Sequence, residues 1–337
     1  MSTPETNRVW RLTERPTAAF SPDEHVELAT APVPEPADGQ ALVRVTHLSL
    51  DPTIRGWMQQ DTYLPAIGIG EVVRSMGIGE VIASKSDKYP VGALVSGLTG
   101  WQEYVLAEER GAGALQILPE GTDPLVAISL FGPTGLAAYF GLLRVGELKE
   151  GDTVLVSGAA GATGSVVGQI AKLKGCRVIG TAGGPEKCAY VVDELGFDEC
   201  VDYKADDVAK TLRSAIGPDG VDVYFDNVGG PLLEMALSNL ALHARIVICG
   251  AISQYDGAAP KGPRNYSNLI VKRAKMEGFL IFDYAKDHPQ AFADLGQWAG
   301  EGKVNAKVDL EHGIEAVPPA FTKLFTGGNV GKNAVAL

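Results

Sequence analysis

The sequence is short of basic residues and of long apolar runs, and both shortages exclude classes of protein. Its 29 Lys and Arg face 41 Asp and Glu, which gives a formal net charge of −12. Nucleic-acid binding depends on clustered Lys and Arg, so we expect no nucleic-acid partner. No run approaches the roughly 18 uninterrupted apolar residues that a membrane span needs, and residues 1–16 lack the apolar core of a signal peptide. We therefore expect a cytoplasmic protein without a membrane partner.

Residues that bind metals are also scarce and scattered. The chain has 4 cysteines and 5 histidines, and neither residue type shows the paired spacing of a metal site. Catalytic zinc needs about three converging Cys, His or carboxylate ligands. We therefore expect no metal, and we expect the cysteines to be reduced thiols. Chemistry that needs no Lewis acid, such as hydride delivery to an alkene next to a carbonyl, fits this composition better than alcohol oxidation does.

The first part of the chain reads as a β-rich unit, and 337 residues are enough for two domains. Short apolar runs separated by glycine and proline lie at residues 41–50, 77–83, 92–96 and 101–106. Such closely spaced short strands predict a β-barrel or a sandwich-like unit. After residue 288 the chain holds a helix candidate at 290–301 and a glycine-rich stretch at 326–332, which could return to this unit.

From about residue 151 apolar runs alternate with helical patterns. The candidate strands are residues 153–157, 177–181, 221–225, 245–249 and 277–282. The first two strands are each followed by a helix candidate, at 165–174 and at 186–195. In the first of these helices Val166, Ile170 and Leu173 lie on one face. Alternation of buried strands with helices predicts an α/β fold with a doubly wound parallel sheet.

A run of small residues, Ser157 to Gly164, connects the first of these strands to the first helix. It fits the Gly-x-Gly-x-x-Gly pattern of dinucleotide-binding turns imperfectly, because Ala159 occupies the first glycine position. Small residues let the backbone approach a pyrophosphate, and the start of the helix supplies N–H groups and a positive dipole end. Many glycine-rich loops serve turn geometry alone, but a position between a buried strand and a helix is what dinucleotide binding requires.

The end of the second strand indicates which dinucleotide is bound. NAD sites usually place Asp or Glu about 20 residues after the glycine turn, where the acid binds the ribose 2′-hydroxyl. Here the strand ends in Gly183 and Gly184, no acid is present, and Lys187 follows within one helical turn. A 2′-phosphate needs room and a cation, which Gly183 and Lys187 would supply. Lys187 could instead be an ordinary exposed helix lysine, but together with the missing acid it favours NADPH over NADH.

With these features located, the chain resembles the zinc-independent branch of the medium-chain dehydrogenase/reductases. It is most similar to the group of prostaglandin reductases, plant alkenal double-bond reductases and curcumin reductases. The resemblance covers nearly the whole chain, through residues 48–52, 70–81, 158–174, 225–230, 249–255, 276–281 and 325–332. The chain departs from the group at Thr53, where a tyrosine is common, and around residues 65–71. These departures leave the size and polarity of the substrate open.

The resemblance implies a GroES-like catalytic domain of residues 1–127 and 298–337, packed on a Rossmann NADPH-binding domain of residues 128–297. It also implies a homodimer, for which the sheet edge at 277–282 is a candidate interface. Its motifs assign the cofactor to Gly161, Ala162, Thr163, Gly164, Gly183, Lys187, Tyr203, Asn227, Cys249, Gly250, Ser253, Phe279 and Asn329. Asn227 could instead only shape a turn, and Cys249 could instead only end a core strand.

Tyr255 is the candidate catalytic residue, because the resemblance implies that it lies near the nicotinamide. A phenol, with an ordinary pKa of about 10, can donate a hydrogen bond to the substrate carbonyl and can then protonate the enolate. Tyr255 could equally be a packing residue, with water or the ribose 2′-hydroxyl as the proton donor. Arg55 and Tyr63 are candidate residues of the substrate pocket.

Together these expectations describe NADPH-dependent reduction of the C=C bond of α,β-unsaturated aldehydes and ketones. Hydride would reach the β-carbon, and protonation of the enolate would follow. Two alternatives stay open, namely quinone reduction by NADPH and a non-catalytic protein that only binds NADPH.

Overall fold

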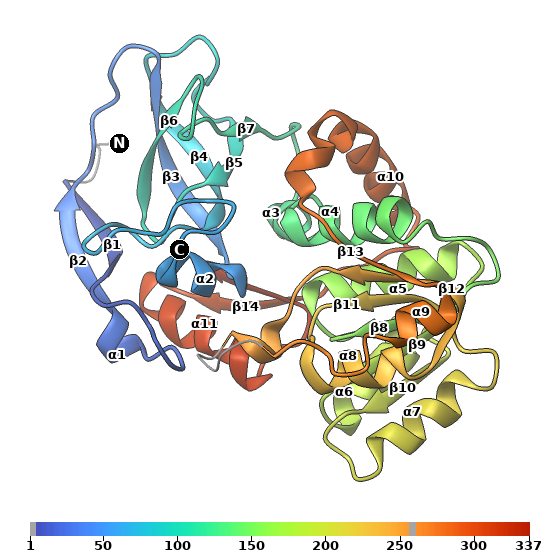
Figure 1. Cartoon of the computed structure of the whole chain (residues 1–337). Helices are drawn as coiled ribbons and strands as arrows, with labels where there is room; N and C mark the ends of the chain where they lie inside the picture. The colour runs from blue at the N-terminus through green and yellow to red at the C-terminus, as the bar shows by residue number, and fades with distance from the viewer. Residues whose placement is uncertain (1–4, 256–260) are drawn as a thin grey trace.

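The computed structural model describes residues 5–255 and 261–337, which contain two large β-sheets of different construction (Figure 1). One is a seven-stranded, mostly antiparallel sheet, and the other is a six-stranded parallel sheet. Separate apolar clusters cover the two faces of the parallel sheet, each built with its own helices. The predicted fold class, a doubly wound parallel sheet joined to a β-rich unit, is confirmed. No helix within the described ranges is long and apolar enough to span a membrane.

The antiparallel sheet is centred on β3, which pairs with three neighbours. In spatial order its strands are β14 (Val308–His312), β15 (Lys332–Ala336), β3 (Gln40–Ser49), β4 (Met76–Ser84), β5 (Leu94–Leu98) and β7 (Gln116–Ile117), with β6 (Tyr104–Glu108) also paired to β3. A separate hairpin joins β1 (Thr6–Leu12) to β2 (Val26–Pro32). The four strands predicted from the sequence in this part of the chain are present, each displaced by a few residues at its ends.

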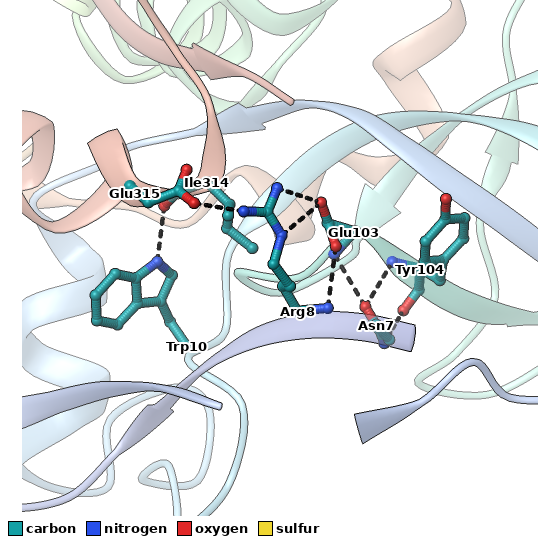
Figure 2. A network of polar contacts seen from close by, with 7 residues as sticks. All are labelled: Asn7, Arg8, Trp10, Glu103, Tyr104, Ile314 and Glu315. Carbon is teal, nitrogen blue, oxygen red and sulfur yellow. Dashed lines mark hydrogen bonds and ion pairs between the residues drawn. The ribbon is translucent and has the colours of Figure 1, made fainter. Parts of the chain in front are cut away.

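The C-terminal segment returns to the β-rich sheet, where β15 lies between β14 and β3. Figure 2 shows how strand β1 is tied to this segment. The indole of Trp10 donates to the carbonyl of Ile314 at 2.7 Å. The guanidinium of Arg8 pairs with Glu103 at 2.8 Å and also with Glu315. Residues from both ends of the sequence therefore build one unit.

A buried ion pair makes a second connection between the two ends of the sequence. Lys332, at the start of β15, is 1% exposed. Its ammonium donates to a carboxylate oxygen of Asp51 at 2.7 Å and to the carbonyl of Leu50 at 2.9 Å. The second oxygen of Asp51 accepts a hydrogen bond from Ser49. This network fixes the end of β3 against the last strand.

The parallel sheet has its first strand, β8, in the interior. In spatial order the strands are β10 (Glu199–Asp202), β9 (Arg177–Ala182), β8 (Thr153–Ser157), β11 (Val221–Asp226), β12 (Leu240–Ile248) and β13 (Lys275–Gly278). The chain builds outward from β8 to β9 and β10 and then crosses over to β11. Ligands of open α/β sheets bind at the carboxyl ends of the strands beside such a switch in direction. The fold therefore places a binding site at the ends of β8, β9 and β11.

Most of the helices accompany the parallel sheet. The α-helices are α1 (Pro22–His25), α2 (Thr53–Gln59), α3 (Pro124–Ser129), α4 (Pro133–Phe140), α5 (Ala162–Leu173), α6 (Pro185–Ala189), α7 (Val208–Ile216), α8 (Gly230–Leu237), α9 (Asn268–Lys272), α10 (His288–Gly300) and α11 (Val317–Thr326). Two of them, α4 and α6, continue into π-helical turns, η1 (Gly141–Val145) and η2 (Tyr190–Glu194). Short 3₁₀ turns are η3 (Ile252–Gln254), η4 (Ile281–Asp287) and η5 (Ile314–Ala316). The helices predicted at 165–174, 186–195 and 290–301 are thus present.

The strand predicted at residues 277–282 is wrong in its second half. Strand β13 begins earlier and ends at Gly278, and the chain enters η4 at Ile281. The physical reason is the packing of the segment after Gly278. Phe279 turns inward onto the core of the parallel sheet instead of continuing along its edge.

Candidate active site

The glycine turn between β8 and α5 has the geometry of a phosphate site. Gly158 has φ +63°, a conformation that side chains disfavour, and Gly161 is the N-cap of α5. The N–H groups of Ala162, Thr163 and Gly164 lie in the first turn of the helix, where no intrahelical acceptor exists. A methyl group on Gly164 would lie 2.3 Å from the carbonyl oxygen of Gly158. The turn therefore closes tightly and leaves its amide groups for an anion.

Ala159 stands where the dinucleotide-binding pattern has its first glycine, and the neighbouring strand β9 leaves room for its methyl group. Its side chain is fully buried. A Cβ atom on Gly180 of β9 would lie 2.7 Å from the Cβ of Ala159. The small residue needed for close packing is therefore supplied by β9, and the turn keeps its shape with alanine at this position.

The carboxyl end of β9 gathers the residues predicted for the adenosine 2′-phosphate. A Cβ atom on Gly183 would lie 2.6 Å from the hydroxyl of Tyr203 and 3.0 Å from the Cε of Lys204. Lys204 is exposed and was not predicted. The pairing of β10 with β9, in which Asp202 lies opposite Ala182, brings Lys204 to this position, and no strand was predicted there from the sequence. The structure therefore adds a second cation beside Lys187.

Lys187 is half-buried rather than an ordinary exposed lysine of a helix. Its ammonium donates to the carbonyl of Gly327 at 2.9 Å and to that of Asn329 at 2.6 Å. Burial, reinforced by the charge of Lys204, lowers the pKa of Lys187 from its ordinary value. An ammonium has three N–H donors, so one is left for a ligand. Lys187 thus joins the phosphate side of the site to the C-terminal glycine-rich segment.

That segment lies directly against the glycine turn. The amide of Gly331 donates to the carbonyl of Ala160 at 2.7 Å, and Gly331 forms an isolated bridge with Gly161. The side-chain amide of Asn329 donates to the carbonyl of Gly331 at 3.0 Å. Asn329 is therefore held next to the predicted pyrophosphate position, although it is far from it in sequence.

At the end of β11 a buried carboxylate organises the residues predicted for the other end of the cofactor. One oxygen of Asp226 accepts from the hydroxyls of Ser157 at 2.9 Å and Tyr224 at 2.8 Å. The same oxygen accepts from the backbone amides of Val228 at 3.0 Å and Gly229 at 2.9 Å. This network fixes the turn that follows β11. Asp226 was not identified from the sequence, although it directly follows the strand predicted at 221–225 and lies in the matching segment 225–230.

Asn227 and Ser253 both make hydrogen bonds within the protein. The amide of Asn227 donates to the carbonyl of Ser157 at 2.7 Å, and the hydroxyl of Ser253 donates to the carbonyl of Val228 at 2.6 Å. Asn227 thus shapes its turn, and this role leaves its side-chain oxygen for a ligand.

The thiol of Cys249 lies at the same end of the sheet. Burial, aided by the nearby Asp226, raises the pKa of Cys249 to about 12, so this thiol stays neutral at physiological pH.

Tyr255 lies at the same end of the sheet, after η3. Its hydroxyl accepts a hydrogen bond from the backbone amide of Ala251 at 3.2 Å and lies 3.5 Å from a Cβ atom built on Gly250. Burial raises the pKa of Tyr255, so the phenol keeps its proton across the neutral range. Phe279 packs against Gly141, where a Cβ atom would lie 2.6 Å from its ring. The hydroxyl of Tyr255 therefore accepts a hydrogen bond from the backbone, and its own proton stays available for donation to a ligand.

The two predicted substrate residues have different environments. Arg55 lies in α2 and is completely buried, with its guanidinium bonded to the carbonyl of Ala18. It contributes to the interior of the β-rich unit, and the prediction that it contacts substrate does not fit this position. Tyr63 is 43% exposed, and its hydroxyl shares a hydrogen bond with Thr53 at 3.0 Å. Tyr63 remains a candidate wall of the pocket.

Two protein-family models match separate parts of the chain. A family described as "N-terminal domain of oxidoreductase" matches residues 8–115, and one described as "Zinc-binding dehydrogenase" matches residues 162–298. Despite the second description, no group of three or more His, Cys, Asp or Glu among residues 5–255 and 261–337 could hold a metal ion.

Individual relatives match over nearly their whole length. The NADPH-dependent curcumin reductase of Escherichia coli (strain K12) is 38% identical over 97% of this chain and 95% of its own. The NADP(+)-dependent 2-alkenal reductase of Nicotiana tabacum is 38% identical over 90% of this chain and 88% of its own. The crystal structure of CurA from Vibrio vulnificus in complex with NADPH superimposes with a TM-score of 0.91, at 42% identity over 98% of both chains. The chain therefore belongs to the medium-chain dehydrogenase/reductase family, in the group of the prostaglandin, alkenal and curcumin reductases.

Proposed function

We propose that this protein reduces the C=C bond of α,β-unsaturated aldehydes and ketones with NADPH. The observation that carries the cofactor choice is the pair of lysines, Lys187 and Lys204, beside Gly183 at the end of β9. In NAD sites a carboxylate at the end of this strand binds the ribose 2′-hydroxyl, whereas here the carboxylate of Asp202 accepts hydrogen bonds from the backbone amides of Gly184 and Lys204. The substrate class is supported by the 2-alkenal reductase, which is 38% identical to this chain.

The residues of the chain fit such a cofactor from end to end. The tight turn at Gly164 would let the first amides of α5 bind the pyrophosphate. The cofactor supplies hydride when it is bound. Tyr255 would donate a hydrogen bond to the substrate carbonyl oxygen and so stabilise the enolate that forms. It would then protonate this enolate. The other assigned residues, among them Asn227, Cys249, Ser253, Phe279 and Asn329, would line the cofactor.

A comparison of substrates tests the reaction directly. NADPH oxidation is followed with a medium-chain 2-alkenal, an aryl enone and a benzoquinone, each at equal concentration and enzyme load. Faster turnover of the alkenal and the enone is expected. A clear preference for the quinone would replace this proposal by quinone reduction, and NADPH binding without turnover of any of them would make the protein a cofactor-binding module.

Replacing Lys187 by alanine should weaken NADPH binding about tenfold, because one charge-assisted hydrogen bond to the 2′-phosphate is worth roughly 1.5 kcal/mol. NADH lacks this phosphate, so its affinity should change much less. Fluorescence titration of both cofactors against the wild type and the variant measures the two changes. Equal losses would remove the 2′-phosphate assignment and leave Lys187 with its structural bonds to Gly327 and Asn329 alone.

Replacing Tyr255 by phenylalanine should lower kcat on a small enone about tenfold, since the developing enolate would lose one hydrogen bond. Because burial raises the pKa of Tyr255 above its ordinary value of about 10, the wild type should show no loss of activity from phenol ionisation as the pH rises to about 9. Rates from pH 6 to 10 for both proteins check the point. Unchanged turnover in the variant would make Tyr255 a packing residue.

We propose that one domain consists of residues 1–127 and 298–337 and the other of residues 128–297. The core packing supports these limits to within a few residues. Ile128 packs with the β-rich sheet, whereas Leu130 packs with the parallel sheet. Trp298 and Val304 also pack with the parallel sheet, which favours a second limit slightly later than 298. We further propose a cytoplasmic homodimer joined through β13, since β13 is the edge strand of its sheet.

A further inference from the structure

Two exposed aromatic rings meet where the β-rich unit and the parallel-sheet unit face each other. Tyr63 follows α2, and Phe282 lies in η4. Their ring centroids are 6.0 Å apart, and the ring planes are inclined at 53°. Tyr63 is 43% exposed and Phe282 is 58% exposed. Exposed apolar side chains that adjoin one another, unlike isolated ones, are a common feature of ligand-binding surfaces.

Phe282 is carried by a segment that is itself well packed. Tyr284, two residues later, stacks on Phe140 with centroids 4.8 Å apart and an interplanar angle of 8°. The ring of His288 is within 3.0 Å of the carbonyl of Ile281, and Ile281 packs on the core of the parallel sheet. The backbone on both sides of Phe282 is therefore held in place, while the Phe282 ring stays outside the core.

Tyr63 is supported in the same way from the other unit. The buried ring of Trp57 contacts it edge-on, with centroids 6.0 Å apart, and its hydroxyl is bonded to Thr53. Burial is the main cause of the raised pKa of Tyr255, and smaller contributions come from Cys249 and then from Tyr63, which is therefore near that phenol. Tyr63 thus connects the exposed ring of Phe282 to the neighbourhood of Tyr255.

We infer that Tyr63 and Phe282 form an aromatic gate that selects enones with a planar aryl group on the β-carbon over enones with an alkyl chain. The inference rests on the proposed function and adds to it the residues that set its specificity. A flat ring can stack on both side chains, with centroid distances in the usual range of about 4.5–7 Å. A flexible alkyl chain gains no such stacking and loses rotational freedom when it is ordered. A small outward movement of either ring would admit an aryl group between them.

A pair of matched substrates tests the gate. Trans-4-phenyl-3-buten-2-one and trans-3-decen-2-one are both methyl ketones with the same number of carbon atoms, and they differ in the group on the β-carbon. The wild type should favour the aryl enone in kcat/KM by about tenfold. Phe282→Leu should reduce this ratio by about fivefold, the contribution of one aromatic pair, whereas Phe282→Tyr should keep it. The control is Tyr266→Leu, because Tyr266 is 64% exposed and its neighbour Asn265 is bonded to Glu234 and Ser238 and to neither ring of the gate.

The same proteins separate failure of the gate from failure of the proposed function. If both enones are reduced but the wild type has no aryl preference, or Phe282→Leu keeps the preference, the gate is overturned and the function stands. If neither enone is reduced, the proposed function fails. In that case the gate is tested by measuring the affinities of 4-phenyl-2-butanone and 2-decanone for the NADPH-loaded protein. Equal affinities for these two ketones, or a ratio unchanged by Phe282→Leu, would overturn the gate as well.

Discussion

Replacing Lys332 by methionine is expected to lower the free energy of unfolding by about 3–5 kcal/mol, the usual cost of removing one partner from a buried ion pair. Lys332 is 1% exposed, and its ammonium serves both Asp51 and the carbonyl of Leu50. Methionine has a similar shape but no donor. The substitution would leave a buried carboxylate and a buried carbonyl without their partner. Urea unfolding, followed by tryptophan fluorescence, measures the change.

Two further variants identify the cause of that loss. In Asp51→Leu/Lys332→Met both charges are removed, so the double variant should recover part of the stability lost in the single one. Arg44→Met removes an exposed pair with Glu80, whose side chains are 52% and 40% exposed, and should cost less than about 1 kcal/mol. The opposite result is a double variant that is less stable than Lys332→Met, because each substitution adds its own loss. That result would show that packing, and not charge, explains the effect.

Replacing Gly164 by alanine should weaken NADPH binding by about 100-fold or more, which is roughly 2.7 kcal/mol. The new methyl group would lie 2.3 Å from the carbonyl oxygen of Gly158, and the obstacle is backbone rather than a movable side chain. The turn must therefore open, which displaces the amides that point at the pyrophosphate. Displacements of about 1 Å are known to cost factors of this size at sites that depend on alignment. Isothermal titration with NADPH gives the affinity.

The matched control for this substitution is Gly296→Ala in α10. There the nearest atom to a new Cβ is 3.5 Å away, on the ring of Phe131, which is ordinary contact. Alanine inside a helix is intrinsically favoured over glycine by about 1 kcal/mol, so this variant should be at least as stable as the wild type and should bind NADPH normally. Normal NADPH affinity in Gly164→Ala would mean that the turn is not where the pyrophosphate lies.

Much of the parallel sheet could be predicted from the sequence because its signals are local. The buried strand ending at Ser157, the small residues after it and the helical spacing of Val166, Ile170 and Leu173 lie within a short stretch of chain. Hydrophobic periodicity and turn composition report such local structure well. The same holds for Gly183 and Lys187, which follow β9 directly.

What could not be predicted depends on contacts between distant segments. Lys204 comes near Gly183 only through the pairing of β10 with β9. Arg55 points into the interior because of how α2 sits on the β-rich unit, which its own sequence does not specify. Phe282 was expected in a strand, yet the inward turn of Phe279 carries it to the junction with Tyr63. In each case tertiary packing overrides what the local pattern indicates.

The interior place of β15 also affects the order in which the protein can fold during synthesis. The parallel sheet is built from β8 to β13 without a break, so the ribosome releases all of its strands before β15 is made. Domains of nascent chains generally fold as units as they emerge. The edge of β3 that β15 covers stays open during this time, and open strand edges are the usual starting points of aggregation. The antiparallel sheet that β3 starts is therefore completed only after every strand of the parallel sheet has been made.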